Sequence, residues 1–293
     1  MNTANQDNLS VISFNGAKLK VYNFGGSGPT LIVAHATGFN SPSYRLLATE
    51  LVKDFTVIGI DAEGHGFSDL TPDGSNWSNY AKHIEFFIRE RGLRRIFGFG
   101  HSFGGAALIQ AAASDIDAFE KVVTYEPVIF PGPPSSEPNY DSPITQLTLK
   151  RQFEFDSKEQ ASANFKSKPP MNSFASGVVE DYVDGGTHAT KSGTVELNCD
   201  RNFEASVYAH APMAGIEALL PKIKCQVAIL FGEKSKDFTY DFYVNIVSKA
   251  QQGTLRSMDS IGHFGPFEDP ERVAKAITTT IFSGDNSGQN TRF

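Results

Sequence analysis

Short apolar runs, each bounded by turn residues, alternate with amphipathic or Ala-rich stretches along most of the 293-residue chain. This alternation predicts an α/β fold in which a mostly parallel, twisted sheet is covered by helices on both faces. Strands are expected near residues 18–24, 30–34, 56–60, 96–100, 122–125, 227–231 and 255–258. Helices are expected near residues 43–53, 78–91, 103–113, 237–250 and 270–282. The polar segment before residue 18 is expected to be loose.

The alternation stops between about residues 130 and 220. This segment opens with the Pro- and Ser-rich stretch FPGPPSSEPNYDSP and then has the pattern of several short amphipathic helices. We therefore expect a core domain at 1–129 and 221–293 and an inserted domain at 130–220. Its aromatic residues should mostly pack among themselves, while some face the sheet: Phe153, Phe155, Phe165, Phe174, Tyr182, Phe203 and Tyr208.

The composition indicates a soluble protein that acts on a small molecule. The net charge of -7 disfavours binding to nucleic acid and to anionic lipid surfaces. No apolar stretch approaches the roughly 18 to 20 residues that span a bilayer. Because no secretory signal is visible near the start, we expect a cytoplasmic protein in which Cys199 and Cys225 are free thiols. The composition leaves the oligomeric state open.

A serine lies between glycines where an expected strand gives way to an expected helix, in the stretch FGFGHSFGGAAL at residues 97–108. Its centre, GHSFG, has the pattern G-x-S-x-G. On a tight strand-to-helix turn, the residues two before and two after the serine must lack side chains to avoid collision. The first amides of the following helix then point at the oxyanion that forms when the hydroxyl attacks a carbonyl. The pattern predicts that Ser102 is a nucleophile.

A serine nucleophile needs a base, which should come from a loop at the carboxyl edge of the sheet. His263 lies directly after the last expected strand and before a helix that opens at Asp269 and Pro270. The other histidines lie beside the serine, upstream of it or in the inserted segment: His35, His65, His83, His101, His188 and His210. His83 in particular is expected on a helix surface. We therefore predict that His263 is the base.

Taken together, these motifs resemble the α/β-hydrolase superfamily over nearly the full length of the chain. The matching stretches are HATGF at 35–39, DAEGHGFSD at 61–69, the serine turn, the turn at Gly232, and Gly262 with His263. The resemblance implies the α/β-hydrolase fold, with the insertion as a helical cap after the sixth strand. It also implies an oxyanion hole made by the backbone amides of Phe103 and Thr37. Ala36 departs from the family, which usually has glycine there.

Two carboxylates compete for the role of the acid that orients His263. The commonest family position is an aspartate after the seventh strand, but the turn at residues 232–235 reads GEKS, with Ser235 in that place. Asp237 could reach the histidine from two residues further on, or it could cap the next helix. Glu126 ends the sixth strand, a position that some members of the superfamily use. Both candidates satisfy the need for a carboxylate.

The resulting hypothesis is a carboxylesterase-like serine hydrolase that cleaves esters of small to medium apolar substrates through an acyl-enzyme. A carbon-carbon bond hydrolase, a thioesterase or a cofactor-free perhydrolase would keep the same residues. A ligand receptor with vestigial hydrolysis is the alternative from another class. We expect no cofactor and no metal site, since the cysteines and histidines lack metal-ligand spacing.

Overall fold

The computed structural model describes residues 9–114, 117–236, 238–283 and 291–292. The strands of its main sheet are β1 (Leu9–Phe14), β2 (Ala17–Gly25), β3 (Thr30–Ala34), β4 (Thr56–Ile60), β5 (Ile96–His101), β6 (Phe119–Tyr125), β10 (Gln226–Gly232), β11 (Gly253–Met258) and β12 (Thr291–Arg292). They form a nine-stranded sheet in the order β1-β2-β4-β3-β5-β6-β10-β11-β12. Neighbouring strands from β4 to β12 are parallel, whereas β1 and β2 form an antiparallel edge. The predicted, mostly parallel sheet is confirmed.

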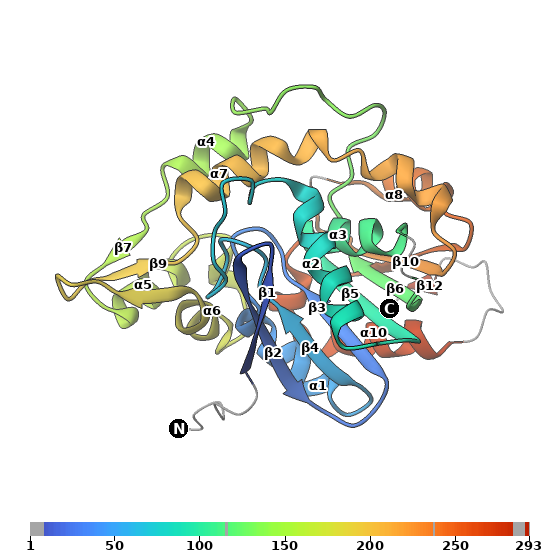
Figure 1. Cartoon of the computed structure of the whole chain (residues 1–293), viewed down its shortest axis with the longest axis horizontal. Helices are drawn as coiled ribbons and strands as arrows, with labels where there is room; N and C mark the ends of the chain where they lie inside the picture. The colour runs from blue at the N-terminus through green and yellow to red at the C-terminus, as the bar shows by residue number, and fades with distance from the viewer. Residues whose placement is uncertain (1–8, 115–116, 237, 284–290, 293) are drawn as a thin grey trace.

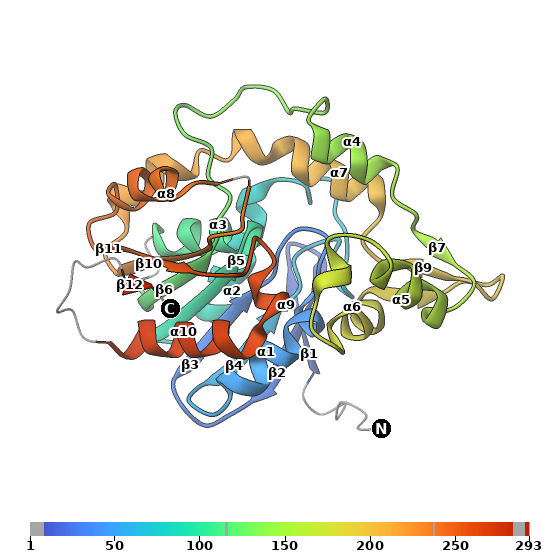
Figure 2. The ribbon, with the colours of Figure 1, turned by 180° about the vertical axis from the view of Figure 1, so that it is seen from behind.

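Helices cover both faces of this sheet, as Figures 1 and 2 show from opposite sides. One face carries α1 (Arg45–Leu51), which follows η2 (Ser41–Tyr44), and α10 (Pro270–Phe282), which follows α9 (Gly265–Glu268). The other face carries α2 (Trp77–Glu90), α3 (Phe103–Ala112) and α8 (Tyr240–Val247). Each set of helices buries its apolar side against the sheet, which gives one hydrophobic cluster on each face.

Short polar side chains explain where two of these helices begin. The Asn76 side chain accepts a hydrogen bond of 3.0 Å from the Ser78 amide at the start of α2. The Asp269 side chain accepts one of 3.2 Å from the Arg272 amide at the start of α10. Each cap satisfies an amide that has no acceptor within its own helix.

Most of the expected elements are confirmed, and β3, β4 and α10 have the expected bounds. The expectation of a loose segment before residue 18 is wrong for residues 9–14, which form β1. The sequence does alternate there, since Val11 is 53% exposed and Ile12 only 8%. The helix expected from residue 237 begins later, at Tyr240.

The inserted segment contains four short helices, where several were expected, and a small sheet that was not expected. The helices are α4 (Pro143–Leu149), α5 (Lys158–Lys166), α6 (Val178–Gly186) and α7 (Arg201–His210), with the 3-10 turns η3 (Met171–Ser173), η4 (Ala211–Met213) and η5 (Ile216–Lys222). The strands β7 (Glu154–Phe155), β9 (Val195–Leu197) and β8 (Thr187–Ala189) pair antiparallel in that order. Gly193, at φ 88°, lies in the turn between β8 and β9. Buried Val195 and Leu197 flank half-buried Glu196, which is a strand pattern too short to stand out in the sequence.

This segment packs on the loops that follow the strands of the main sheet. The side-chain amide of Asn40, after β3, donates to the carbonyl oxygen of Tyr182 at 3.0 Å. The backbone amide of Ala175 donates to the carbonyl oxygen of Phe267 at 2.8 Å. Figures 1 and 2 show the segment, coloured green to orange, extending from α8 past α2 to the β1 side. No strand of the nine-stranded sheet lies within residues 130–220, all of which the structure describes. We propose on this basis that 130–220 is a cap on a core at 1–129 and 221–293.

The aromatic residues of the insertion pack partly with one another and partly with the core. The rings of Phe155 and Phe165 lie 5.3 Å apart within the insertion. Tyr182 instead packs 5.4 Å from Phe39, and Phe203 belongs to the hydrophobic cluster that includes α2 and α3. The insertion therefore shares its hydrophobic core with both faces of the sheet.

Candidate active site

Ser102 lies on a sharp turn between β5 and α3. Its backbone adopts φ 55° and ψ -115°, in a region that residues other than glycine rarely occupy. Two glycines make the turn possible: a Cβ on Gly104 would lie 2.1 Å from the carbonyl oxygen of Ala34, and one on Gly100 would lie 2.5 Å from that of Gly104. The Ser102 amide donates to the carbonyl oxygen of Tyr125 at 2.9 Å. Among the described residues, the Ser102 hydroxyl itself has no hydrogen-bond partner.

The structure brings Glu126 and His263 together. Glu126 Oε2 lies 2.8 Å from His263 Nδ1, and the Glu126 side chain is fully buried while that of His263 is 20% exposed. The amide of Gly232 donates to Glu126 Oε1 at 2.8 Å, and the hydroxyl of Ser235 donates to Oε2 at 2.8 Å. These bonds hold the carboxylate in one orientation. With Nδ1–H donating to it, a neutral His263 keeps Nε2 free as a proton acceptor.

Ser235 is a supporting residue that the sequence reasoning missed. It occupies the place of the commonest family aspartate, and its hydroxyl donates to the carboxylate of Glu126, the residue directly after β6. The sequence held a signal for this contact. Position 235 lacks the usual carboxylate and position 126 supplies one, so both residues are expected beside the same histidine. Asp237, the other candidate acid, lies outside the described residues, so its role stays a prediction.

The two amides predicted for the oxyanion hole make no hydrogen bond within the described part of the chain. Neither the Thr37 amide nor the Phe103 amide has a hydrogen-bond acceptor there. The amide of Ala36, by contrast, donates to the Tyr44 hydroxyl at 3.0 Å. Ala36 adopts a negative φ, and the first positive φ in this loop is at Gly38, at 77°. The alanine in place of the usual glycine is therefore accommodated without backbone strain.

A group of aromatic rings lies beside His263. The ring of Phe264 is 5.1 Å from that of His263 and 5.5 Å from that of Phe174, which comes from the insertion. Phe39 and Phe267 complete this group, with their ring centres 4.6 Å apart. An aromatic cluster shared by core and insertion thus adjoins the histidine, and its members Phe39 and Phe267 are buried.

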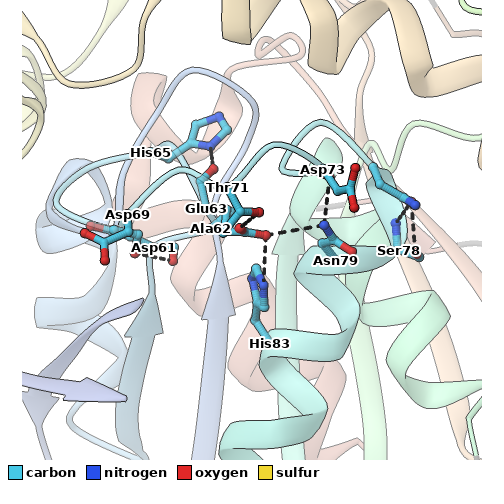
Figure 3. Close-up of polar contacts among 12 residues, drawn as sticks. Asp61, Ala62, Glu63, His65, Asp69, Thr71, Asp73, Ser78, Asn79 and His83 are labelled. Atoms are coloured by element: carbon cyan, nitrogen blue, oxygen red, sulfur yellow. Dashed lines mark hydrogen bonds and ion pairs between the residues drawn. The ribbon is translucent and has the colours of Figure 1, made fainter. Parts of the chain in front are cut away.

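The turn that follows β4 carries carboxylates whose hydrogen bonds stay within the turn and its neighbours. Figure 3 shows Glu63 reaching toward Thr71, Asn79 and His83, and His83 Nε2 lies 3.2 Å from Glu63 Oε2. His83 is only 1% exposed, so the expectation that it lies on a helix surface is wrong. It faces inward because α2 packs this side against β1, where its ring meets that of Phe14 at 5.3 Å. We interpret this turn as structural.

Two further histidines near the serine turn are held in the neutral state. Burial lowers the pKa of His35 to about 3, and the nearby His65 adds to this effect. Burial also lowers the pKa of His65 to about 4, against the opposing hydrogen bond to the carbonyl oxygen of Glu63. Neither side chain is poised to exchange a proton near neutral pH.

Two general features of the described residues bear on function. They contain no group of three or more His, Cys, Asp or Glu side chains that could hold a metal ion. A helix long and apolar enough to cross a membrane is likewise absent from the part of the chain that the structure describes.

Comparisons with known proteins show the family to which the chain belongs. The model of the alpha/beta hydrolase family matches residues 31–276. A curated relative, 2-(acetamidomethylene)succinate hydrolase of Mesorhizobium japonicum, is 34% identical over 101 residues, which are 34% of this chain. The aligned region spans 36% of that relative, so the chain matches only about a third of its length.

Two solved structures show the same fold at low identity. The crystal structure of E-2-(acetamidomethylene)succinate hydrolase superposes with a TM-score of 0.77 at 21% identity and covers 94% of this chain and 99% of that one. A thioesterase domain from the curacin biosynthetic pathway superposes with a TM-score of 0.75 at 17% identity, covering 92% and 99%. With the family model matching most of its length, this chain belongs to the alpha/beta hydrolase family.

Proposed function

We propose that the protein is a serine hydrolase that works through an acyl-enzyme. The Ser102 hydroxyl attacks a substrate carbonyl while His263 Nε2 accepts its proton, and the amides of Phe103 and Thr37 stabilise the oxyanion. His263 then gives the proton to the leaving group. Water, activated in the same way, releases the acid and restores the serine. The observation that carries this proposal is the buried Glu126 carboxylate 2.8 Å from His263 Nδ1, beside the serine turn.

The proposed substrate is a carboxylic ester of small to medium size with an apolar group. The aromatic group supports this choice through its half-buried members Phe174 and Phe264, because Phe264 adjoins His263 and both rings can contact an apolar acyl or alcohol group. Phe39 and Phe267 are buried behind them.

A second candidate keeps the same residues and changes the bond that is cleaved. The relative from Mesorhizobium japonicum is named for hydrolysis of 2-(acetamidomethylene)succinate, which favours a carbonyl substrate other than a simple ester. A thioesterase or a carbon-carbon bond hydrolase belongs to this second candidate.

A substrate panel tests both candidates. We expect turnover of p-nitrophenyl esters of increasing acyl length, with thioesters measured in parallel, and we expect Ser102→Ala to abolish it. A fluorophosphonate should label the wild type at Ser102, as mass spectrometry of the labelled peptide would show, and should leave Ser102→Ala unlabelled. Preference for thioesters would favour the second candidate. A wild type with neither turnover nor labelling would favour a ligand receptor and contradict the proposal.

A further inference from the structure

The residues that directly precede Ser102 and Glu126 both hold the loop of His263. His101 Nε2 lies 2.8 Å from the carbonyl oxygen of His263. The Tyr125 hydroxyl donates to the carbonyl oxygen of Gly262, the next residue back, at 2.7 Å. His101 and Tyr125 are fully buried, so water cannot replace either bond.

A second set of bonds connects His101 to the oxyanion loop. The Ala36 amide donates to the Tyr44 oxygen at 3.0 Å, and that oxygen lies 2.7 Å from His101 Nδ1. The carbonyl oxygen of His263 can only accept, so His101 carries its proton on Nε2 and donates it there. Nδ1 of the neutral ring is then an acceptor, and the Tyr44 hydroxyl donates to it. The direction of every bond in this chain is thereby set.

The charge state of His101 agrees with this assignment. Burial lowers the pKa of His101 well below its ordinary value, and the neighbouring His263 acts in the same direction. A protonated His101 would place a second donor against the Tyr44 hydroxyl. The neutral imidazole offers what the position needs: a donor on one ring nitrogen and an acceptor on the other.

We propose that His101, together with Tyr44, is a positioning residue that fixes the loop of His263 and the oxyanion loop relative to each other around Ser102. This inference rests on the roles proposed above for Ser102 and His263. Catalytic groups must be held to within about 0.5 Å of their working geometry, and a displacement of about 1 Å can cost about 100-fold in rate. This series of hydrogen bonds connects the loop of His263 with the oxyanion loop. The relative placement of these loops decides whether one substrate carbonyl can be served by both of them.

Two substitutions at residue 101 separate the positioning role from simple packing. His101→Gln can place an amide N–H near the position of Nε2 and so keep a donor for the His263 carbonyl. His101→Asn has a shorter side chain that can still meet Tyr44 but cannot reach that carbonyl. We expect His101→Asn to lower kcat by about 10- to 100-fold with little change in KM. His101→Gln should recover most of this loss.

Tyr44→Phe tests the other end of the chain, because it removes the hydroxyl that joins Ala36 to His101. We expect it to lower kcat, and we expect its effect and that of His101→Asn to be less than additive in the double variant. Thr187→Val is the control for the loss of one buried hydroxyl, since Thr187 donates to the Val183 carbonyl at 2.7 Å within the insertion. It should lower the melting temperature without the fall in kcat.

Ester turnover, the rate of fluorophosphonate labelling of Ser102 and the melting temperature would be measured for every variant. The proposal expects turnover and labelling to fall together in His101→Asn, beyond any effect of Thr187→Val at a similar melting temperature. If the wild type is active and the kcat of His101→Asn equals that of the wild type or that of His101→Gln, this inference alone is overturned. If His101→Asn does not fold, Tyr44→Phe decides, and unchanged kcat there overturns the inference. A wild type without turnover or labelling overturns the proposed function as well.

Discussion

At the scale of single residues, the hydrogen bonds of Glu126 explain how a glutamate at the end of β6 can take the role of the acid. Its two carboxylate oxygens accept from Gly232, Ser235 and His263, so a fully buried negative charge has polar partners on both oxygens. Gly232 ends β10 and Ser235 lies in the turn after it, where the family more often has its aspartate. The serine at 235 leaves room for the glutamate and donates a hydrogen bond to it.

The identity of the acid is tested by comparing Glu126→Gln with Asp237→Asn on one ester. We expect Glu126→Gln to lower kcat by about 10³- to 10⁴-fold, because the amide no longer stabilises the imidazolium. Asp237→Asn should lose far less. Steady-state kinetics on both variants measures this difference, and a larger loss in Asp237→Asn would reverse the assignment.

A matched double variant sharpens the same prediction. Ser235→Asp places a carboxylate near Glu126 Oε2, the atom that now meets His263. We expect it to restore part of the activity lost in Glu126→Ala, since the acid only has to reach Nδ1. In the presence of Glu126, the same substitution should be harmful because two carboxylates would then meet.

At the scale of elements, the turn between β5 and α3 is a tight junction beside the site. α3 begins directly after Ser102 and packs on β3, where the backbone at Gly104 approaches the carbonyl oxygen of Ala34. The same approach places the first amides of α3 beside the oxyanion loop that follows β3. Close packing of helix on strand and the geometry of the site therefore depend on one glycine.

Gly104→Ala should destabilise the fold by about 1 to 3 kcal/mol and remove activity, because its Cβ would collide with backbone that cannot move freely. Urea unfolding and ester turnover measure the two effects. Gly262→Ala is the matched control for stability, since a Cβ there would meet no neighbour closer than 3.7 Å. A Gly104→Ala protein as stable and active as the wild type would show that this approach is not required.

At the scale of the whole molecule, burial favours the neutral form of several titratable side chains in the core. His35 and His65 have pKa values lowered by burial to about 3 and about 4. Asp61 behaves in the opposite way, since burial raises its pKa to about 6 in spite of hydrogen bonds from Ser41 and Phe67. Folding therefore keeps the histidines unprotonated and the aspartate protonated over part of the acidic range.

These shifts predict how the free energy of unfolding depends on pH. Below pH 6.5, His35 and His65 bind protons in the unfolded chain but stay neutral in the folded one. The free energy of unfolding therefore falls as the pH drops toward 4. Asp61 opposes this: between pH 3.8 and about 6 the folded state holds a proton that the unfolded state releases, so its contribution falls as the pH rises. We expect Asp61→Asn to lose stability more steeply than the wild type on acidification. Urea titrations at several pH values measure both slopes, and equal slopes would contradict the prediction.

The sequence predicted the central parallel sheet and the serine turn because each has a strong local cause. Apolar runs of strand length between helical patterns have few other ways to bury their surface, and the glycines around Ser102 have little other use. It missed β1 although the sequence alternates there, and it missed the small sheet of β7, β8 and β9, whose strands have only two or three residues each. It also misplaced His83, because a helical pattern does not say which polar residue will meet a buried carboxylate such as Glu63.

By itself, the sequence determined the kind of fold, the candidate nucleophile and the candidate base, since these depend on spacing along the chain and on local backbone requirements. Only the tertiary structure decided that Glu126 lies against His263, that Ser235 supports it, and that His101 and Tyr44 connect the two loops beside Ser102. These contacts join residues up to 162 positions apart, from His101 to His263. Which side chains meet over such separations is set by how the strands are ordered in the sheet and how the helices pack on it, and no local pattern encodes that.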